Sequence, residues 1–246
     1  MKRVPVKLAQ DLIVEAIFEI RFVGKVPSVS DLLPGLLYPR FRDRYQNPER
    51  LPFSEFPREI QEADPTFRYQ PRLRIAGEQT AILLGDRSAI VNCPKPYIGW
   101  SKYRALILEV IGALHETDLI TSVERYSVKY LNVIPGPTFQ EQLKAVNFSA
   151  HLGNYKLTEW PTSVRTEIKE DGLINIVEVQ PNSVITNRQK ESFRGLLVTV
   201  DTIAQGTDNF WANPETNIDK IHTKEKEIFF DLLTRETIEK CGPVWE

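Results

Sequence analysis

Residues 13–22 are the stretch that most restricts what this chain can fold into. Every second side chain in it is apolar, and the side chains between them include two glutamates and an arginine. This period of two, together with the β-branched and aromatic content, predicts a strand with one buried face. The chain must therefore cover one face of a sheet.

A second alternating stretch, residues 122–134, carries a matching charge pattern. Glu15 and Glu19 lie four residues apart on the first strand, and Arg125 and Lys129 have the same spacing on the second. An antiparallel pairing that sets Glu15 opposite Lys129 also sets Glu19 opposite Arg125, and such cross-strand pairs stabilise a sheet. We expect the two strands to be neighbours in this register. On the apolar face the same register pairs Phe18 with Tyr126 and Ala16 with Val128.

The order strand, helix, several strands, helix occurs twice along the chain. Helices are expected at residues 28–37, 101–114, 139–146 and 213–241. Strands are expected at residues 67–75, 79–84, 88–93, 148–157, 163–169, 173–179 and 193–203. A three-residue loop around Asp171 and Gly172 would place Ile168 opposite Ile174 and Thr166 opposite Ile176.

These patterns predict an α+β fold made of a pseudo-duplicated unit. A curved antiparallel sheet would pack against long helices, because each element presents one apolar face. We interpret residues 1–246 as one domain with pseudo-repeat halves of about 1–117 and 118–246.

Composition and charge exclude some classes of protein. The net charge is −2 and the isoelectric point is near 6.0, so the whole molecule does not attract nucleic acid or an anionic membrane. No apolar run approaches the roughly 18 residues that cross a bilayer, and acidic residues follow the basic start where a signal peptide would be apolar. Cys93 and Cys241 are far apart, as is typical of free thiols in a reducing compartment. We therefore expect a cytoplasmic protein without a membrane partner.

The search for catalytic motifs is negative. The sequence contains no phosphate-binding or dinucleotide-binding glycine motif, no H-E-x-x-H, no G-x-S-x-G and no C-x-x-C. The three histidines, His115, His151 and His222, lie in separate segments, and we expect structural roles for them. We interpret the acidic pair Glu225 and Glu227 as surface residues of a helix. The sequence thus predicts no catalytic residue, no metal site and no cofactor.

Arginine usage gives the strongest sign of a binding site. Between residues 26 and 94 every basic residue is arginine, and tyrosine and phenylalanine lie among them. Guanidinium groups suit the bidentate recognition of carboxylate or phosphate. The alternative is that these arginines pair with nearby acidic residues on a solvated surface. The candidate anion- or partner-binding residues are Arg40, Arg42, Arg44, Arg68, Arg72 and Arg74.

Several blocks, taken in order, resemble a sporadically distributed, uncharacterised prokaryotic protein family of about 250 residues. They are residues 13–22, Asn92 with residues 96–100, residues 126–134, residues 197–201, and His222 with Phe229, Phe230 and Thr234. Lys129 stands where the third block usually has arginine. The resemblance implies a shared core but no activity, and the patchy occurrence of the family points to mobile or defence-type gene neighbourhoods. The polar motif residues Asn132 and Asp201 would serve either buried backbone groups or a site.

The favoured function is a non-catalytic protein that binds an anionic ligand or a protein partner. A nucleic-acid-associated accessory protein is the first alternative, and it predicts that the six arginines share one face. An enzyme of unrecognised class is the second, and it predicts a pocket where His151, Asp201 or a pair of carboxylates converge with perturbed pKa values. A homo-oligomer is compatible with the sequence, with Trp245 as a contact.

Overall fold

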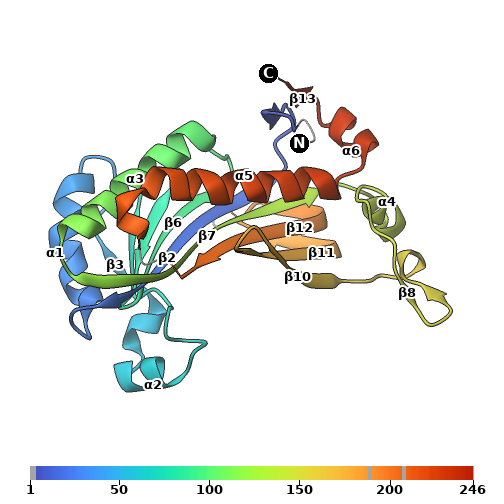
Figure 1. The fold of residues 1–246 in the computed structure, drawn as a ribbon. Helices are drawn as coiled ribbons and strands as arrows, with labels where there is room; N and C mark the ends of the chain where they lie inside the picture. The colour runs from blue at the N-terminus through green and yellow to red at the C-terminus, as the bar shows by residue number, and fades with distance from the viewer. Residues whose placement is uncertain (1–3, 188–189, 207–208, 246) are drawn as a thin grey trace.

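An antiparallel sheet with helices along one face forms the body of the protein (Figure 1). The computed structural model describes residues 4–187, 190–206 and 209–245. Within these residues the sheet has nine strands in the order β10-β11-β12-β7-β2-β6-β5-β4-β3. The strands are β2 (Ile13–Gly24), β3 (Glu49–Arg50), β4 (Leu73–Ala76), β5 (Ala81–Leu84), β6 (Ser88–Pro94), β7 (Ile120–Ile134), β10 (Val164–Glu170), β11 (Leu173–Thr186) and β12 (Ser192–Gln205). The expected α+β class is confirmed.

The connectivity on the two sides of the sheet is the same. In the first half, β2 leads into α1 (Val29–Phe41), then β3 to β6, then α3 (Trp100–Glu116). In the second half, β7 leads into α4 (Phe139–Leu143), then β10 to β12, then α5 (Pro214–Leu232). The last strand of each half, β6 or β12, pairs with the first strand of that half, and the two first strands pair at the centre. This order is the one that the expected pseudo-duplication predicts. The pseudo-repeat halves and their boundary near residue 117 stay a prediction.

Short elements decorate this frame. They are η1 (Pro52–Glu55), α2 (Arg58–Ala63), the hairpin β8 (His151–Leu152) and β9 (Tyr155–Lys156), η2 (Leu157–Glu159), η3 (Phe210–Ala212) and α6 (Arg235–Lys240). Strand β1 (Lys7–Leu8) pairs with β13 (Pro243–Val244), so the N-terminal segment lies beside the C-terminal one (Figure 1).

The core lies between the sheet and the helices. Phe18 on β2, Val128 on β7 and Tyr103 on α3 are buried in one hydrophobic cluster. The apolar residues that recur at helical spacing along α3 are all buried: Tyr103, Leu106, Ile107, Val110, Ile111 and Leu114. The opposite face of the sheet carries charged side chains, among them Glu19 and Arg125, which form an ion pair at 2.9 Å. Alternation along β2 thus separates the core from the polar face, as predicted.

The register of β2 and β7 differs from the expected one by two residues. The strands are antiparallel neighbours as predicted, but Phe18 lies opposite Val128 and Ala16 lies opposite Tyr130. A shift of two residues keeps every side chain on the same face of the sheet. It also places the small side chain of Ala16 opposite the ring of Tyr130. Glu19 still reaches Arg125 diagonally, whereas Glu15 accepts a hydrogen bond from Asn92 Nδ2 at 2.6 Å.

The turn between β10 and β11 is shorter than expected. Asp171 and Gly172 have φ values of 53° and 75° and form a two-residue turn with positive φ at both positions. Glu170 therefore pairs with Leu173, and Ile168 lies opposite Asn175 and not opposite Ile174. The expectation of a three-residue loop was wrong. The observed loop is one residue shorter, so each residue of β10 pairs with the residue of β11 one position further along than expected.

Three expected elements are shorter than predicted or broken. Residues 67–72 make turns, with Phe67 N and Arg68 N both donating to Asp64 O at 3.0 Å, so only Leu73–Ala76 is a strand. The expected strand 148–157 is the small β8–β9 hairpin. The last helix breaks at Leu233, which is extended. Thr234 then caps α6 by accepting a hydrogen bond from Thr237 N.

Candidate functional site

A cavity of about 610 Å³ lies between the N-terminal segment, the start of α3, strand β7 and the middle of α5. Its apolar lining includes Leu12, Ile98 and Phe229, and its polar lining comes from all four elements. The volume falls within the roughly 300–1,000 Å³ typical of small-molecule sites. This cavity is the candidate site.

Residues from three of the sequence blocks converge on this cavity. Tyr97 and Trp100 come from the segment after β6, Tyr130 and Asn132 from β7, and His222 from α5. Sequence reasoning assigned His222 a structural role and gave Tyr97 and Tyr130 no role. The one signal for the site was the presence of polar and aromatic side chains in blocks otherwise rich in apolar residues.

The backbone after β6 sets the positions of Tyr97 and Trp100. The peptide bond between Lys95 and Pro96 is cis, and Lys95 N donates to Val14 O at 3.0 Å. Gly99 precedes α3 with a φ of 85°, a backbone conformation that residues other than glycine rarely adopt. The chain can therefore turn into the helix with Trp100 as its first residue.

Two tyrosines and a histidine form a connected polar group in the cavity wall. The hydroxyls of Tyr97 and Tyr130 are 2.9 Å apart, and Tyr130 Oη lies 3.4 Å from His222 Nδ1. The His222 ring stacks on Trp100 with centroids 3.6 Å apart. Burial raises the pKa of both tyrosines and lowers the pKa of His222 to about 3. All three side chains are therefore neutral near neutral pH.

Glu225 lies three residues after His222 on α5, so both side chains project from the same face of the helix. It is only 4% exposed, and its Oε1 atom is buried without a hydrogen-bond partner among the described residues. Burial raises the pKa of its carboxyl well above the usual value. The expectation that Glu225 is a surface residue was wrong, because α5 turns this position toward the sheet.

Charged groups surround the mouth of the cavity. Lys7 and Lys226 both line it, and Lys226 Nζ donates to the carbonyl oxygen of Val6 at 3.1 Å. Asp11 also lines it and accepts a hydrogen bond from Ile13 N at 3.0 Å, while burial raises the pKa of its carboxyl. Two carboxyls with raised pKa, Asp11 and Glu225, thus share the cavity, which is one arrangement that the enzyme alternative predicts.

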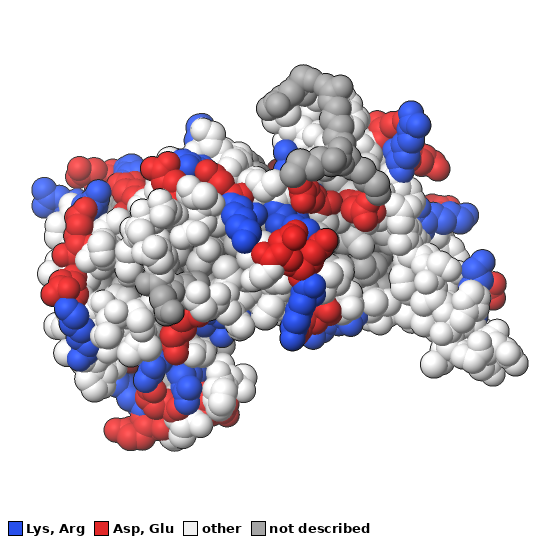
Figure 2. Space-filling model, in the orientation of Figure 1, with Lys and Arg blue, Asp and Glu red and all other residues white. Residues whose placement is uncertain are grey.

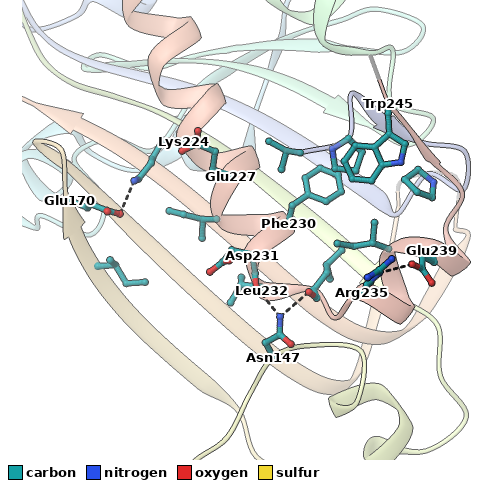
Figure 3. A pocket seen from close by; sticks show the side chains of 17 residues that line it. Asn147, Glu170, Lys224, Glu227, Phe230, Asp231, Leu232, Arg235, Glu239 and Trp245 are labelled. Atoms are coloured by element: carbon teal, nitrogen blue, oxygen red, sulfur yellow. Dashed lines mark hydrogen bonds and ion pairs between the residues drawn. The ribbon is translucent and has the colours of Figure 1, made fainter. Parts of the chain in front are cut away.

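A larger groove of about 1090 Å³ runs along the other side of α5 (Figure 3). Four of its charged side chains form ion pairs: Lys224 with Glu170 at 2.6 Å, and Arg235 with Glu239 at 2.8 Å. Asn147 Nδ2 donates to the carbonyl oxygens of Asp231 and Leu233. Because these polar groups already have partners, the groove is a weaker candidate than the cavity.

The six candidate arginines do not line the cavity or the groove. Three lie at the end of α1, where Arg40 pairs with Glu116, Arg44 pairs with Glu109, and Arg42 lies 3.9 Å from Asp43. In the segment leading into β4, Arg68 binds the carbonyl oxygen of Glu62, and Arg74 pairs with Glu49. Arg72 is buried and donates to Gln61 Oε1 and Ser54 O, both at 2.6 Å. All six thus have partners within the chain, and basic and acidic side chains are interspersed on the face in Figure 2.

The other residues singled out from the sequence lie away from the cavity. His151 is exposed on β8, and Asp201 lies on β12 with Lys129 and Arg125 nearby. Burial raises the pKa of the Asp201 carboxyl, and its Oδ1 atom has no hydrogen-bond partner among the described residues. Cys93 and Cys241 are buried free thiols.

Two searches of the described residues are negative. No three of their histidine, cysteine, aspartate and glutamate side chains are grouped so as to hold a metal ion. None of the helices in this part of the chain combines the length and the apolar character needed to cross a bilayer.

Comparison with known proteins adds no relative. No protein-family model matches the sequence, and no curated protein matches it. The family resemblance stays an expectation based on the sequence blocks.

Proposed function

We propose that this chain is a non-catalytic binding protein whose ligand is a small, partly apolar organic molecule held in the cavity beside α5. The observation that carries the proposal is the buried Oε1 atom of Glu225, which has no partner among the described residues. Buried polar side chains normally have hydrogen-bond partners, and Glu225 lines the cavity, so a ligand bound there would supply one.

The histidine and the tyrosines of the wall favour recognition over catalysis. A general acid or base works best when its pKa is near the working pH. His222, with a pKa of about 3, and the two tyrosines, with raised pKa values, do not exchange protons near neutral pH. They instead offer fixed donors and acceptors. A protein partner and a defence-type gene neighbourhood stay as broader expectations of the same binding role.

The test uses a variant that closes the mouth of the cavity. Ser101 is exposed, lies in the first turn of α3 and lines the cavity, whereas the next residue, Lys102, is exposed and does not. Ligand-observed NMR with a library of small acids, amides and amines should detect binders of the wild type and of the matched control Lys102→Trp. The same compounds should not bind Ser101→Trp. Binding that is equal in all three proteins, or absent from the wild type, would overturn the proposal.

A further inference from the structure

We infer that the ligand of this cavity is a carboxylate, bound by the N-terminal backbone N–H groups of α3 and by the carboxyl group of Glu225. The inference rests on the proposed function and adds the chemical class of the ligand. Three features of the cavity lead to it.

The first feature is the start of α3. Trp100 and Ser101, the first two residues of this 17-residue helix, line the cavity. Gly99 has no side chain to cap them, and the described first turn contains no acidic residue. The first N–H groups of a helix lack partners within the helix and carry partial positive charge. An anion in the cavity would meet this helix end.

The second feature is the protonation state of Glu225. Burial raises the pKa of the Glu225 carboxyl more strongly than the nearby Lys226 lowers it, so desolvation favours the neutral form. A neutral carboxyl donates one hydrogen bond, and a hydrogen bond to a charged acceptor is stronger than one to a neutral acceptor. A carboxylate would provide such an acceptor.

The third feature is the charge around Glu225. Lys7 and Lys226 at the mouth favour an anion, and Asp11 is the opposing charge. An ammonium ligand would meet two lysines and the positive end of α3. The apolar lining suits the rest of a monocarboxylic acid. The titratable and charged groups that line the cavity with Glu225 are His222 and Lys226 from α5, Lys7 and Asp11 from the N-terminal segment, Tyr97 before α3 and Tyr130 from the sheet. Asp201 on β12 lies outside the cavity, and its charge also raises the pKa of Glu225.

The experiment compares three probes of the same shape by isothermal titration calorimetry. These are 3-phenylpropionate, 3-phenylpropanamide and protonated 3-phenylpropylamine. We expect the carboxylate to bind about tenfold or more tightly than the amide, and the ammonium most weakly. Equal binding of amide and carboxylate, or tightest binding of the ammonium, would overturn the carboxylate inference and leave the proposed function standing. If none of the probes binds, both fail.

The pH dependence gives a second readout. The complex needs protonated Glu225, so affinity is greatest below the pKa of this carboxyl in the free protein. As the pH rises above that pKa, affinity falls by up to about tenfold per unit. 3-Phenylpropionate is ionised above about pH 5.5, so its affinity is measured from that pH upward. Binding at a pH above the pKa of Glu225 in the free protein should take up a proton, seen as a binding enthalpy that varies with the ionisation enthalpy of the buffer.

Matched variants separate this role from a structural one. Glu225→Gln keeps a donor but cannot titrate, so it should keep the preference for carboxylate and lose the pH dependence. Glu225→Leu should lose the preference. Glu227→Gln, which lines the groove on the other side of α5, should behave as the wild type. If Glu225→Gln does not fold, the pH series of the wild type decides: an affinity that never falls with rising pH and never couples to proton uptake overturns the inference.

Discussion

At the scale of single residues, burial decides which polar side chains build the fold and which are left for a ligand. Arg72 and Glu225 are both almost fully buried. Arg72 has hydrogen-bond partners from the η1–α2 segment, whereas Glu225 Oε1 has none among the described residues. The sequence placed Glu225 on the surface, which is wrong, and Arg72 among the candidate binding residues, which stays a prediction. A buried polar group with partners holds structure together, and one without them favours a ligand.

Arg72→Met should destabilise the protein by at least about 2 kcal/mol, because Gln61 Oε1 and the carbonyl oxygen of Ser54 would lose their donor while staying partly or fully buried. Urea denaturation measures this loss. Arg42→Met, at a solvent-exposed arginine directly after α1, is the control and should leave the stability unchanged. Equal stability of the two variants would contradict the structural role of Arg72.

At the scale of elements, turns and caps set lengths and registers that periodicity leaves open. The two-residue turn at Asp171 and Gly172 fixes the register of β10 against β11. A threonine cap at Thr234 divides the apolar pattern of the last helix into α5 and α6. Both features depend on one or two residues, so a pattern that averages over a whole strand or helix does not detect them.

Gly172→Ala should cost about 1–2 kcal/mol, because its φ of 75° strains a side chain that has a Cβ atom. Gly112→Ala is the matched change inside α3, where an added Cβ would meet nothing within 4 Å. It should stabilise the protein by about 0.5–1 kcal/mol. Thermal unfolding followed by circular dichroism gives the midpoint temperature of each variant. The prediction fails if both midpoints move in the same direction relative to the wild type.

At the scale of the whole molecule, the pairing of β2 with β7 joins the two halves. Phe18 lies at this junction, fully buried, between Val91 on one side and Val128 on the other. Helices α3 and α5 cover the same face of the sheet (Figure 1). The cavity draws residues from both halves, so it depends on their union.

Phe18→Ala should destabilise the protein by about 3–5 kcal/mol. The halves should still unfold together, with tryptophan fluorescence and far-ultraviolet circular dichroism giving one midpoint. Leu36→Ala, at an exposed position on α1, should change the midpoint little. Separate midpoints from the two probes would show that the halves are independent.

The sequence alone determined the fold class and the longest elements. Alternation identified β2 and β7 as neighbouring strands, and the spacing of apolar residues identified α3. These predictions succeeded because burial of one face depends on local periodicity. Only the tertiary structure decided the register of the central strands and the site. Register depends on how side chains fit across strands, and the cavity needs Tyr97, Tyr130 and Glu225, which are far apart along the chain. The burial that raises the pKa of Glu225 comes from packing α5 on the sheet, and no single helix pattern contains that information.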